Sequence, residues 1–345
     1  MKSVQLTGIR QMTIAEVPEP TGPGPNEVLL RIHSVGICGS DVHYYETGRI
    51  GDQIVEYPYS VGHECAGDVV SVGNGVTGLQ PGDRVVIDPA MPCLECDQCK
   101  AGRENTCREL RFLGCPGQAE GCLSELMVMP AHCCFKMPAT MTYAQGVLCE
   151  PLAIGLYAVQ QAKIKKGMDV AILGSGPIGL SCLVCAQAAG ASGIYVTDKR
   201  DYRVKIAREH GATWAGNPDK EDIVSAINSA QPAGLDVVFE CAGEQDTVHQ
   251  AMDLLKPGGT LMLIGIPRVD DITFPIHRMR RNEISVVNVR RQNRCTHTTV
   301  EWVASGKIDA DFMVTHTLAL ADVQKGFDLV ADYQDGVIKA IVEME

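Results

Sequence analysis

Residues 169–180 read Asp169-Val-Ala-Ile-Leu-Gly-Ser-Gly-Pro-Ile-Gly-Leu180. The apolar run predicts a buried strand, and the three glycines Gly174, Gly176 and Gly179 follow where a helix should begin. The first glycine permits a tight turn, the second lets the backbone approach a pyrophosphate, and the third allows helix and strand to pack closely. Amides at the start of that helix would face the phosphates of a dinucleotide. A turn that merely requires small residues is the alternative.

An acidic residue after the next apolar run strengthens the prediction of a dinucleotide site. The run Ile194–Thr197 is typical of a buried strand, and Asp198 follows it directly. A carboxylate at this position accepts hydrogen bonds from the adenosine ribose and repels a 2′-phosphate, so the expected cofactor is NAD. The basic side chains that follow could instead receive such a phosphate; they are Lys199, Arg200 and Arg203.

The order of strands and helices predicts an α/β protein of two domains. A chain of 345 residues exceeds what one hydrophobic core usually supports. Before about residue 150, short β-type runs such as Glu27–His33 and Cys65–Val72 alternate with glycine and proline turns. After Asp169, strands expected at 170–173, 194–197, 237–240 and 260–264 alternate with helices at 178–189, 203–209 and 248–255, as in a doubly wound parallel sheet. A helix near 299–305 and a strand at 337–344 are expected to rejoin the first domain.

We therefore predict a doubly wound nucleotide-binding domain at residues 153–290, inserted into a β-rich domain made of residues 1–152 and 291–345. The formal net charge of -12 argues against nucleic acid and anionic membranes as partners. Residues 1–20 lack the apolar core of a secretory signal, so we expect a cytoplasmic protein. The uncharged stretch between Asp169 and Asp198 is long enough to suggest a membrane span, but its glycines and proline divide it into strand, turn and helix.

The fifteen cysteines are odd in number and lie in a long chain, which favours thiols and metal ligands over disulfides. Four of them share one loop with a spacing that could surround a tetrahedral zinc ion; they are Cys93, Cys96, Cys99 and Cys107. Four thiolates leave no open position, so this site should brace the loop. Iron and sulfur chemistry, or four unrelated thiols, are the alternatives.

A second group of potential ligands is dispersed along the chain. Its members are Cys38, His63 and the neighbouring Glu64, and Glu150, which follows Cys149. One thiolate, one imidazole and one carboxylate would hold zinc with a position left for water or substrate, as a catalytic zinc requires. Taken singly, such a cysteine or histidine is more often structural. The acidic ligand is either Glu64 or Glu150.

Together these segments resemble the zinc-containing medium-chain dehydrogenase/reductase superfamily. The resemblance runs from end to end and rests on Gly36-Ile-Cys-Gly-Ser-Asp41, Gly62-His-Glu64, Gly82-Asp-Arg-Val85, the cysteine loop, Glu150-Pro-Leu152 and the three glycines. The stretch from Cys38 to Tyr44, followed by Gly48-Arg-Ile-Gly51, is similar to the sorbitol (polyol) dehydrogenase branch. The resemblance implies a chaperonin-10-like (GroES-like) catalytic domain, a Rossmann domain, and a homodimer or homotetramer.

By position, the resemblance implies catalytic zinc ligation by Cys38, His63 and Glu64, with Glu150 as a direct or water-mediated ligand. It implies a structural zinc at the four cysteines of the loop, hence two zinc ions per chain. Besides the three glycines, the implied nucleotide contacts are Ile178, Asp198, Arg203, Gly265, Ile266 and Val289. As a hypothesis, Ser40 receives the proton of the substrate hydroxyl and His43 relays it to solvent.

The expected reaction is transfer of a hydride from a polyol such as sorbitol or xylitol to NAD, giving a ketose. Tyr44 and Arg290 match residues that line the substrate pocket in the family, and Glu150 lies at the same centre. Arg291 stands where animal relatives have tyrosine, so it either binds a carboxylate or phosphate or points outward. A sugar acid, a polyol phosphate, threonine or a simple alcohol are therefore alternative substrates. A non-catalytic zinc and nucleotide binder is the alternative from another class.

Overall fold

The computed structural model describes residues 1–344, and they form two compact units. The first unit contains Met1–Glu150 and the segment that begins at Thr296, and the second contains Pro151–Cys295. The predicted domain boundaries lay at residues 152/153 and 290/291, two and five residues from these divisions. None of the helices within residues 1–344 is long and apolar enough to cross a membrane.

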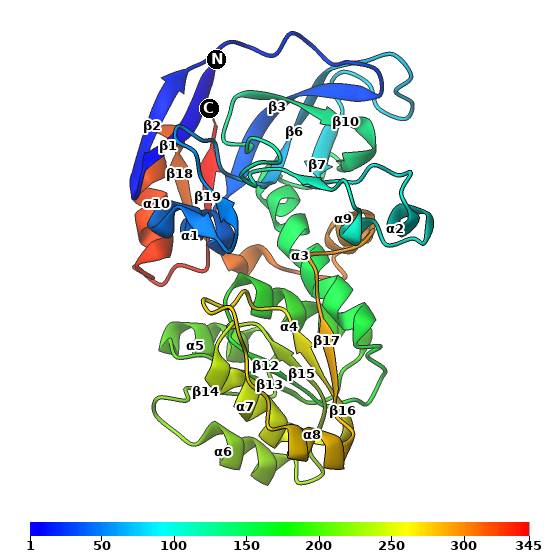
Figure 1. Cartoon of the computed structure of the whole chain (residues 1–345), viewed down its shortest axis with the longest axis vertical. Helices are drawn as coiled ribbons and strands as arrows, with labels where there is room; N and C mark the ends of the chain where they lie inside the picture. Colours follow the sequence, from blue (N-terminus) through cyan, green and yellow to red (C-terminus); the bar gives the residue numbers. More distant parts are fainter. Residues whose placement is uncertain (345) are drawn as a thin grey trace. The chain divides into compact units, whose positions relative to one another are not determined.

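The second unit is built on a parallel sheet of six strands (Figure 1). The strand order is β14-β13-β12-β15-β16-β17. The strands are β12 (Val170–Leu173), β13 (Ile194–Thr197), β14 (Trp214–Gly216), β15 (Leu235–Glu240), β16 (Leu255–Leu263) and β17 (Ser285–Asn288). The order reverses beside β12, whose Val170 pairs with Ile194 on one side and Val237 on the other. Such a reversal creates the crevice at which this class of sheet binds nucleotides.

Helices of the second unit connect these strands and pack on the sheet (Figure 1). They are α4 (Pro177–Ala189), α5 (Asp201–Glu209), α6 (Ile223–Ala230), α7 (Gln245–Leu254) and α8 (Ile276–Asn282). Strand β12 is apolar and wholly buried, and the mostly apolar α4 buries its central residues 179–186, as expected for the centre of a doubly wound sheet. The long α3 (Tyr143–Gln161) contains Pro151 and supplies residues to both units.

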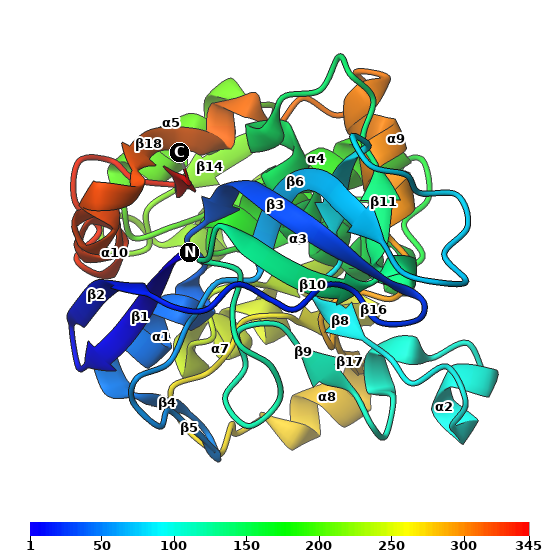
Figure 2. The same cartoon turned by 90° about the horizontal axis from the view of Figure 1, so that it is seen from above.

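The first unit is β-rich and centres on a mostly antiparallel seven-stranded sheet, seen from above in Figure 2. The order is β11-β7-β6-β3-β19-β18, and β10 also pairs with β3. The strands are β3 (Glu27–Gly36), β6 (Glu64–Val72), β7 (Arg84–Ile87), β10 (Leu126–Pro130), β11 (Cys134–Lys136), β18 (Val314–Ala319) and β19 (Lys339–Glu343). Strand β19 comes from the C-terminal segment, so the chain does return to the first unit.

Smaller elements surround this sheet. The strand pairs are β1 (Lys2–Gly8) with β2 (Gln11–Glu16), β4 (Arg49–Ile50) with β5 (Gln53–Ile54), and β8 (Ala90–Met91) with β9 (Arg111–Phe112). The helices are α1 (Gly39–Thr47), α2 (Asp97–Lys100), α9 (Thr296–Ala304) and α10 (Val323–Ala331), with short 3-10 turns at Glu104–Thr106, Ala131–Cys133, Asp311–Met313 and Leu320–Asp322.

The register around β3 explains how distant residues meet. Gly36, at the end of β3, pairs with Glu64 of β6 on one side and with Ile341 of β19 on the other. Successive side chains of a strand alternate between the two faces of a sheet, so this register fixes which side chains of the three strands become neighbours. Residues near 36, 64 and 340 are thereby brought together, although they are far apart in the sequence.

Candidate active site and metal centres

Three potential metal ligands converge at the end of β3. Cys38 lies directly before α1, His63 directly before β6, and Glu64 is the first residue of β6. One ligand atom of each lies within 4.8 Å of the other two. A thiolate, an imidazole and a carboxylate form a donor set that suits zinc. We call these three residues the mixed-ligand site.

Glycines make room for this site. A Cβ atom on Gly36 would lie 2.2 Å from Oε2 of Glu64 and 2.8 Å from Cγ1 of Val147, so any larger residue would displace the carboxylate. Gly62 has φ of +99°, a conformation that favours glycine, and it directs the chain into His63. Gly36 is therefore required by the packing around Glu64, and Gly62 by its backbone conformation.

Asp41, on the first turn of α1, accepts hydrogen bonds from both Cys38 and His63 and so fixes their positions. Its Oδ1 accepts hydrogen bonds from the backbone amide of Gly62 at 3.2 Å and from Nδ1 of His63 at 3.2 Å. Its Oδ2 accepts one from the amide of Cys38 at 3.3 Å. Burial lowers the pKa of His63, but Asp41 and Cys38 oppose this, and the pKa ends well above its ordinary value. With Nδ1 engaged, Nε2 is the ring atom left to bind a metal.

A buried lysine, which sequence reasoning missed, completes the surroundings of Glu64. Nζ of Lys339 donates to both carboxylate oxygens of Glu64, at 2.7 and 2.6 Å, and to the carbonyl of Ile37 at 3.2 Å. Lys339 is 1% exposed and lies on β19. Its one sequence signal is a lysine within an otherwise apolar strand, Val337-Ile-Lys-Ala-Ile-Val342.

Glu150 lies in the same unit on α3 but outside the group of three. It is 4% exposed, and its Oε2 atom has no hydrogen-bond partner among the described residues. Burial raises its pKa to about 7, and the charge of Glu64 adds to the shift, while His63 opposes it. A buried, unsatisfied carboxylate oxygen that lies close enough to His63 and Glu64 to interact electrostatically with them is a group that a cation would stabilise. The residues present therefore fit a zinc ion.

The helix α1 carries the other predicted residues of this centre. Ser40 Oγ donates to the sulfur of Cys38 at 3.4 Å, so this hydroxyl touches the mixed-ligand site. Tyr44 is buried, and its hydroxyl donates to Oε1 of Gln53 at 3.0 Å. His43 is partly buried on the same helix. Phe112, which sequence reasoning missed, packs its ring 5.4 Å from that of His63.

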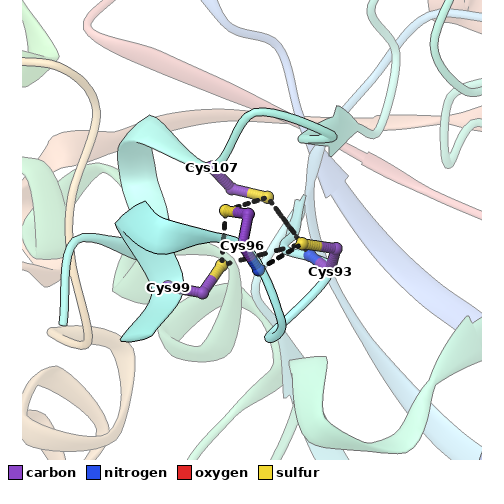
Figure 3. A group of neighbouring side chains, drawn as sticks. All are labelled: Cys93, Cys96, Cys99 and Cys107. Atoms are coloured by element: carbon purple, nitrogen blue, oxygen red, sulfur yellow. Dashed lines mark hydrogen bonds between the residues drawn. The ribbon is translucent and has the colours of Figure 1, made fainter. Parts of the chain in front are cut away.

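The four predicted loop cysteines form a second centre, which we call the four-cysteine site (Figure 3). Neighbouring sulfurs lie 3.4 Å apart for Cys93 and Cys107, 3.6 Å for Cys96 and Cys99, 3.9 Å for Cys96 and Cys107, and 4.0 Å for Cys93 and Cys99. Four sulfurs bound to one zinc at about 2.3 Å would be about 3.8 Å apart. The sulfurs thus already have the spacing of a tetrahedral zinc site.

The thiols of this site differ in pKa. Backbone amides of Arg108 and Cys99 donate to Cys96 and lower its pKa to about 6. Burial raises the pKa of Cys99 to about 12 and also raises the pKa of Cys107. A bound zinc ion would hold all four as thiolates.

The dinucleotide motif has the geometry that its glycines predict. Gly174 has φ of +95°, and a Cβ on Gly179 would lie 1.9 Å from the carbonyl oxygen of Gly174, so the turn and the start of α4 require both glycines. A Cβ on Gly176 would approach Nη1 of Arg203 to 3.3 Å. Asp198 follows β13 and accepts hydrogen bonds from the amides of Ser175 at 2.8 Å and Arg200 at 2.9 Å. Nη1 of Arg203 lies 3.7 Å from its carboxylate.

The remaining predicted nucleotide residues lie near the carboxyl ends of the same sheet. Ile178 is in the first turn of α4, while Gly265 and exposed Ile266 follow β16. Val289 follows β17, and its amide donates to the carbonyl of Leu263 at 2.9 Å. Arg290 and Arg291 come next, also in the second unit, whereas Tyr44 and the metal ligands belong to the first.

Sequence reasoning also missed Glu240, a buried carboxylate at the end of β15. Its Oε1 accepts hydrogen bonds from the amides of Ala242 at 2.9 Å and Gly243 at 2.8 Å, and from Oγ1 of Thr247 at 2.8 Å. A Cβ on Gly265 would lie 2.2 Å from the nitrogen of Gly243, so the loops after β15 and β16 pack closely. Glu240 thus holds the loop after β15 in place, and this loop packs against the loop after β16, which carries the predicted cofactor residues Gly265 and Ile266.

Comparison with known proteins agrees with this architecture. Residues 24–139 match the family model of the alcohol dehydrogenase GroES-like domain, and residues 177–305 match that of the zinc-binding dehydrogenases. Sorbitol dehydrogenase of Bacillus subtilis is 33% identical over 343 residues, which cover 99% of this chain and 97% of the relative. L-idonate 5-dehydrogenase of Vitis vinifera is 36% identical over 333 residues, covering 94% and 90%.

A solved structure shares the fold over nearly the whole length. It is a putative zinc-binding dehydrogenase from Sinorhizobium meliloti, bound to NADP, with a TM-score of 0.90, 33% identity and coverage of 99% of each chain. The predicted fold class, a GroES-like domain with a Rossmann domain, is confirmed. The chain belongs to the zinc-containing medium-chain dehydrogenase family, in the branch that includes the sorbitol dehydrogenases.

Proposed function

We propose that this protein oxidises a secondary hydroxyl of a sugar alcohol to a ketone, with a nicotinamide dinucleotide as hydride acceptor. The observation that carries the proposal is the mixed-ligand site, in which Cys38, His63 and Glu64 converge within 4.8 Å beside the unsatisfied oxygen of Glu150. A zinc ion held there would lower the pKa of the substrate hydroxyl and so favour its deprotonation. The sorbitol and L-idonate dehydrogenases among the relatives support a polyol or a related sugar as substrate.

We assign proton transfer and substrate orientation to residues of α1. Ser40 would accept the hydroxyl proton, because its Oγ lies 3.4 Å from the sulfur of Cys38 and therefore next to the ligands. His43, partly buried on the same helix, would pass the proton to solvent. The hydroxyl of Tyr44, which donates to Gln53, would orient a substrate hydroxyl, and Glu150 would be a direct or water-mediated ligand of the metal.

NAD is the cofactor that we propose within the NAD(P) class. The carboxylate of Asp198 stands at the end of β13, where it would accept hydrogen bonds from the ribose and repel a 2′-phosphate. Arg203, which lies 3.7 Å from that carboxylate, would support the ribose. The remaining contacts would come from the glycine motif, Ile178, Gly265, Ile266 and Val289. A higher kcat/KM with NADP than with NAD would refute this preference.

We further propose two zinc ions per chain, a homo-oligomer and a cytoplasmic protein. The two ligand groups support the zinc count. Strand β17 ends the sheet order of the second unit, and exposed Val269 and Ile276 lie on the loop and helix before it, so this edge suits a second copy. None of the fifteen cysteines, all of which lie within the described residues, forms a disulfide, which suits a reducing compartment.

A sugar acid is the second candidate substrate. The relative named L-idonate 5-dehydrogenase supports it, and the guanidinium groups of Arg290 and Arg291 could bind a carboxylate in bidentate fashion. Arg291 holds φ of +52°, a strained value for arginine, which is the kind of backbone outlier that often accompanies a functional site. Arg291→Ala would then lower kcat/KM for an acid about tenfold or more and leave that for a polyol nearly unchanged.

A substrate panel tests the proposed function. Sorbitol, xylitol, galactitol, their phosphates, sugar acids, threonine and ethanol are each supplied with NAD, and NADH is followed by its absorbance. The expected result is the highest kcat/KM for a polyol or sugar acid. A higher value for threonine or ethanol would overturn the substrate class, and absence of turnover with every compound by the zinc-loaded protein would leave only a zinc and nucleotide binder.

A further inference from the structure

The ion pair between Lys339 and Glu64 lies inside the proposed active centre and has no part in the reaction as described above. Both residues are buried, and Glu64 is one of the three residues of the mixed-ligand site. They come from strands β19 and β6, separated by 275 positions in the sequence. The fold therefore places a cation directly behind a candidate metal ligand.

The hydrogen bonds of Lys339 leave its ammonium group little freedom. An ammonium has three N–H donors. Here they have three acceptors, which are the two carboxylate oxygens of Glu64 and the carbonyl of Ile37. Burial of an unpaired lysine or glutamate strongly destabilises a fold, so each residue of this pair depends on the other.

Glu64 and Glu150 differ in the hydrogen bonds that their carboxylate oxygens accept. Both oxygens of Glu64 are shared with the ammonium of Lys339, whereas Oε2 of Glu150 has no partner among residues 1–344. An oxygen that already accepts a charged hydrogen bond is a weaker electron donor to a metal than one that does not. The ion pair thus weakens Glu64 as a ligand and does not weaken Glu150 in this way.

We propose that Lys339 is a positioning residue that controls how strongly Glu64 binds the metal. Its ammonium keeps Glu64 within reach of the metal but holds it as a weak, exchangeable ligand, so that a position stays open for substrate. The proposal rests on the proposed function, because it assumes a catalytic zinc at the mixed-ligand site. The positive charge also balances part of the negative charge of Cys38, Glu64 and Glu150, the anionic groups that act on Lys339.

The test compares Lys339→Met, which removes the charge from a chain of similar length, with Lys339→Arg and the wild type. Zinc release is followed with a chromophoric chelator, and Cys38→Ser identifies the kinetic phase of the mixed-ligand site. We expect Lys339→Met to slow this phase at least about tenfold and to lower kcat about 10- to 100-fold, with KM for NAD unchanged. Lys339→Arg should restore most of both values, since it keeps the charge beside Glu64.

A matched control is Lys136→Met. Lys136 also pairs with a carboxylate in the first unit, since its Nζ lies 2.8 Å from Oδ2 of Asp83, but this pair is partly exposed and belongs to β11 and the turn before β7. This variant should release zinc at the wild-type rate. A Lys339→Met protein with wild-type zinc release and only a lower melting temperature would overturn the proposal, because the lysine would then be merely structural.

A double variant keeps the proposal testable if Lys339→Met alone does not fold. Glu64→Gln removes the partner charge, so Lys339→Met should add no further change in zinc release to a Glu64→Gln protein, and an additional change of tenfold would contradict the link through Glu64. Zinc release needs no substrate. Failure to oxidise any polyol with the expected release rates would therefore refute the proposed function and leave the role of Lys339 in place.

Discussion

The two groups of potential metal ligands in the first unit have different surroundings. The four-cysteine site uses one loop, offers sulfur alone, and its cysteines are hydrogen-bonded mainly to one another and to nearby backbone amides. The mixed-ligand site draws its residues from separate elements and is enclosed by charged side chains, which are Asp41, Glu150 and Lys339. A closed set of four thiolates can only hold a structure, whereas three mixed donors with a nearby free carboxylate can do chemistry.

The largest expected effect is at the mixed-ligand site. Cys38→Ser should lower kcat/KM at least about a thousandfold, because loss of a first ligand removes the metal that stabilises charge in the reaction. Metal analysis should find one zinc per chain in place of two, and the melting temperature should stay within a few degrees. His63→Ala should behave alike. Full turnover by either variant without zinc would remove this site from the mechanism.

The corresponding change at the four-cysteine site should act on stability first. Cys96→Ser removes one of four potential sulfur ligands, and we expect the melting temperature to fall by about 5–10 °C, as for a loss of about 2–3 kcal/mol in a unit of about 200 residues such as the first. Residual activity per folded molecule should remain close to that of the wild type. Thermal melts followed by circular dichroism check this, and an unchanged melting temperature would show that the site braces nothing.

A smaller effect concerns pH and the reactivity of the loop thiols once zinc is removed. Cys96 has a pKa of about 6, so it is mostly thiolate at pH 7, whereas Cys99, with a pKa of about 12, stays protonated. Iodoacetamide should therefore modify Cys96 at least about tenfold faster than Cys99 at pH 7. Below pH 6 the rate at Cys96 should fall, since protonation removes the nucleophile.

Peptide mapping by mass spectrometry measures these rates. Zinc-loaded protein serves as the control, because bound metal should protect both thiols. Equal labelling of Cys96 and Cys99 in the metal-free protein would mean that backbone amides do not set the reactivity of this loop.

The smallest effect is expected from the ion pair beside the loop. Nε and Nη2 of Arg108 donate to the two carboxylate oxygens of Asp97 at 2.5 and 2.9 Å, but both side chains are exposed. Solvent screens such pairs, so Arg108→Ala should shift the melting temperature by less than about 2 °C. A shift as large as that of Cys96→Ser would show that the pair, and not the metal, stabilises the loop.

The contrast between the two sites also explains what the sequence could predict. The four-cysteine site is local, so the spacing alone predicted that these four cysteines lie together. The three glycines and Asp198 can also be recognised from the sequence, because the strand, turn and helix of this motif follow one another in the chain. The strands and helices predicted for the second unit are present, but their ends are shifted. For example, the strand predicted at 237–240 corresponds to β15, which begins at Leu235.

Residues that meet through the sheet could not be predicted in this way. Lys339 reaches Glu64 only because β19 pairs with β3, and that pairing depends on a connection across the whole second unit. Phe112 and Gln53 contact His63 and Tyr44 from separate short strands, and no motif marks them. The helix α3 was not predicted either, because Pro151 interrupts its pattern. The contacts that distinguish Glu64 from Glu150 are likewise not encoded by any spacing, because the partner of Glu64 is the distant Lys339.

Stepwise removal of zinc tests the division of labour between the two sites most directly. The protein is dialysed against increasing concentrations of a chelator, and zinc content, polyol oxidation and melting temperature are measured on the same samples. We predict that activity disappears with the first zinc lost per chain while the melting temperature stays constant, and that the melting temperature falls with the second. Activity that persists after both ions are gone, or a melting temperature that falls together with activity as the first ion leaves, would contradict two sites with separate roles.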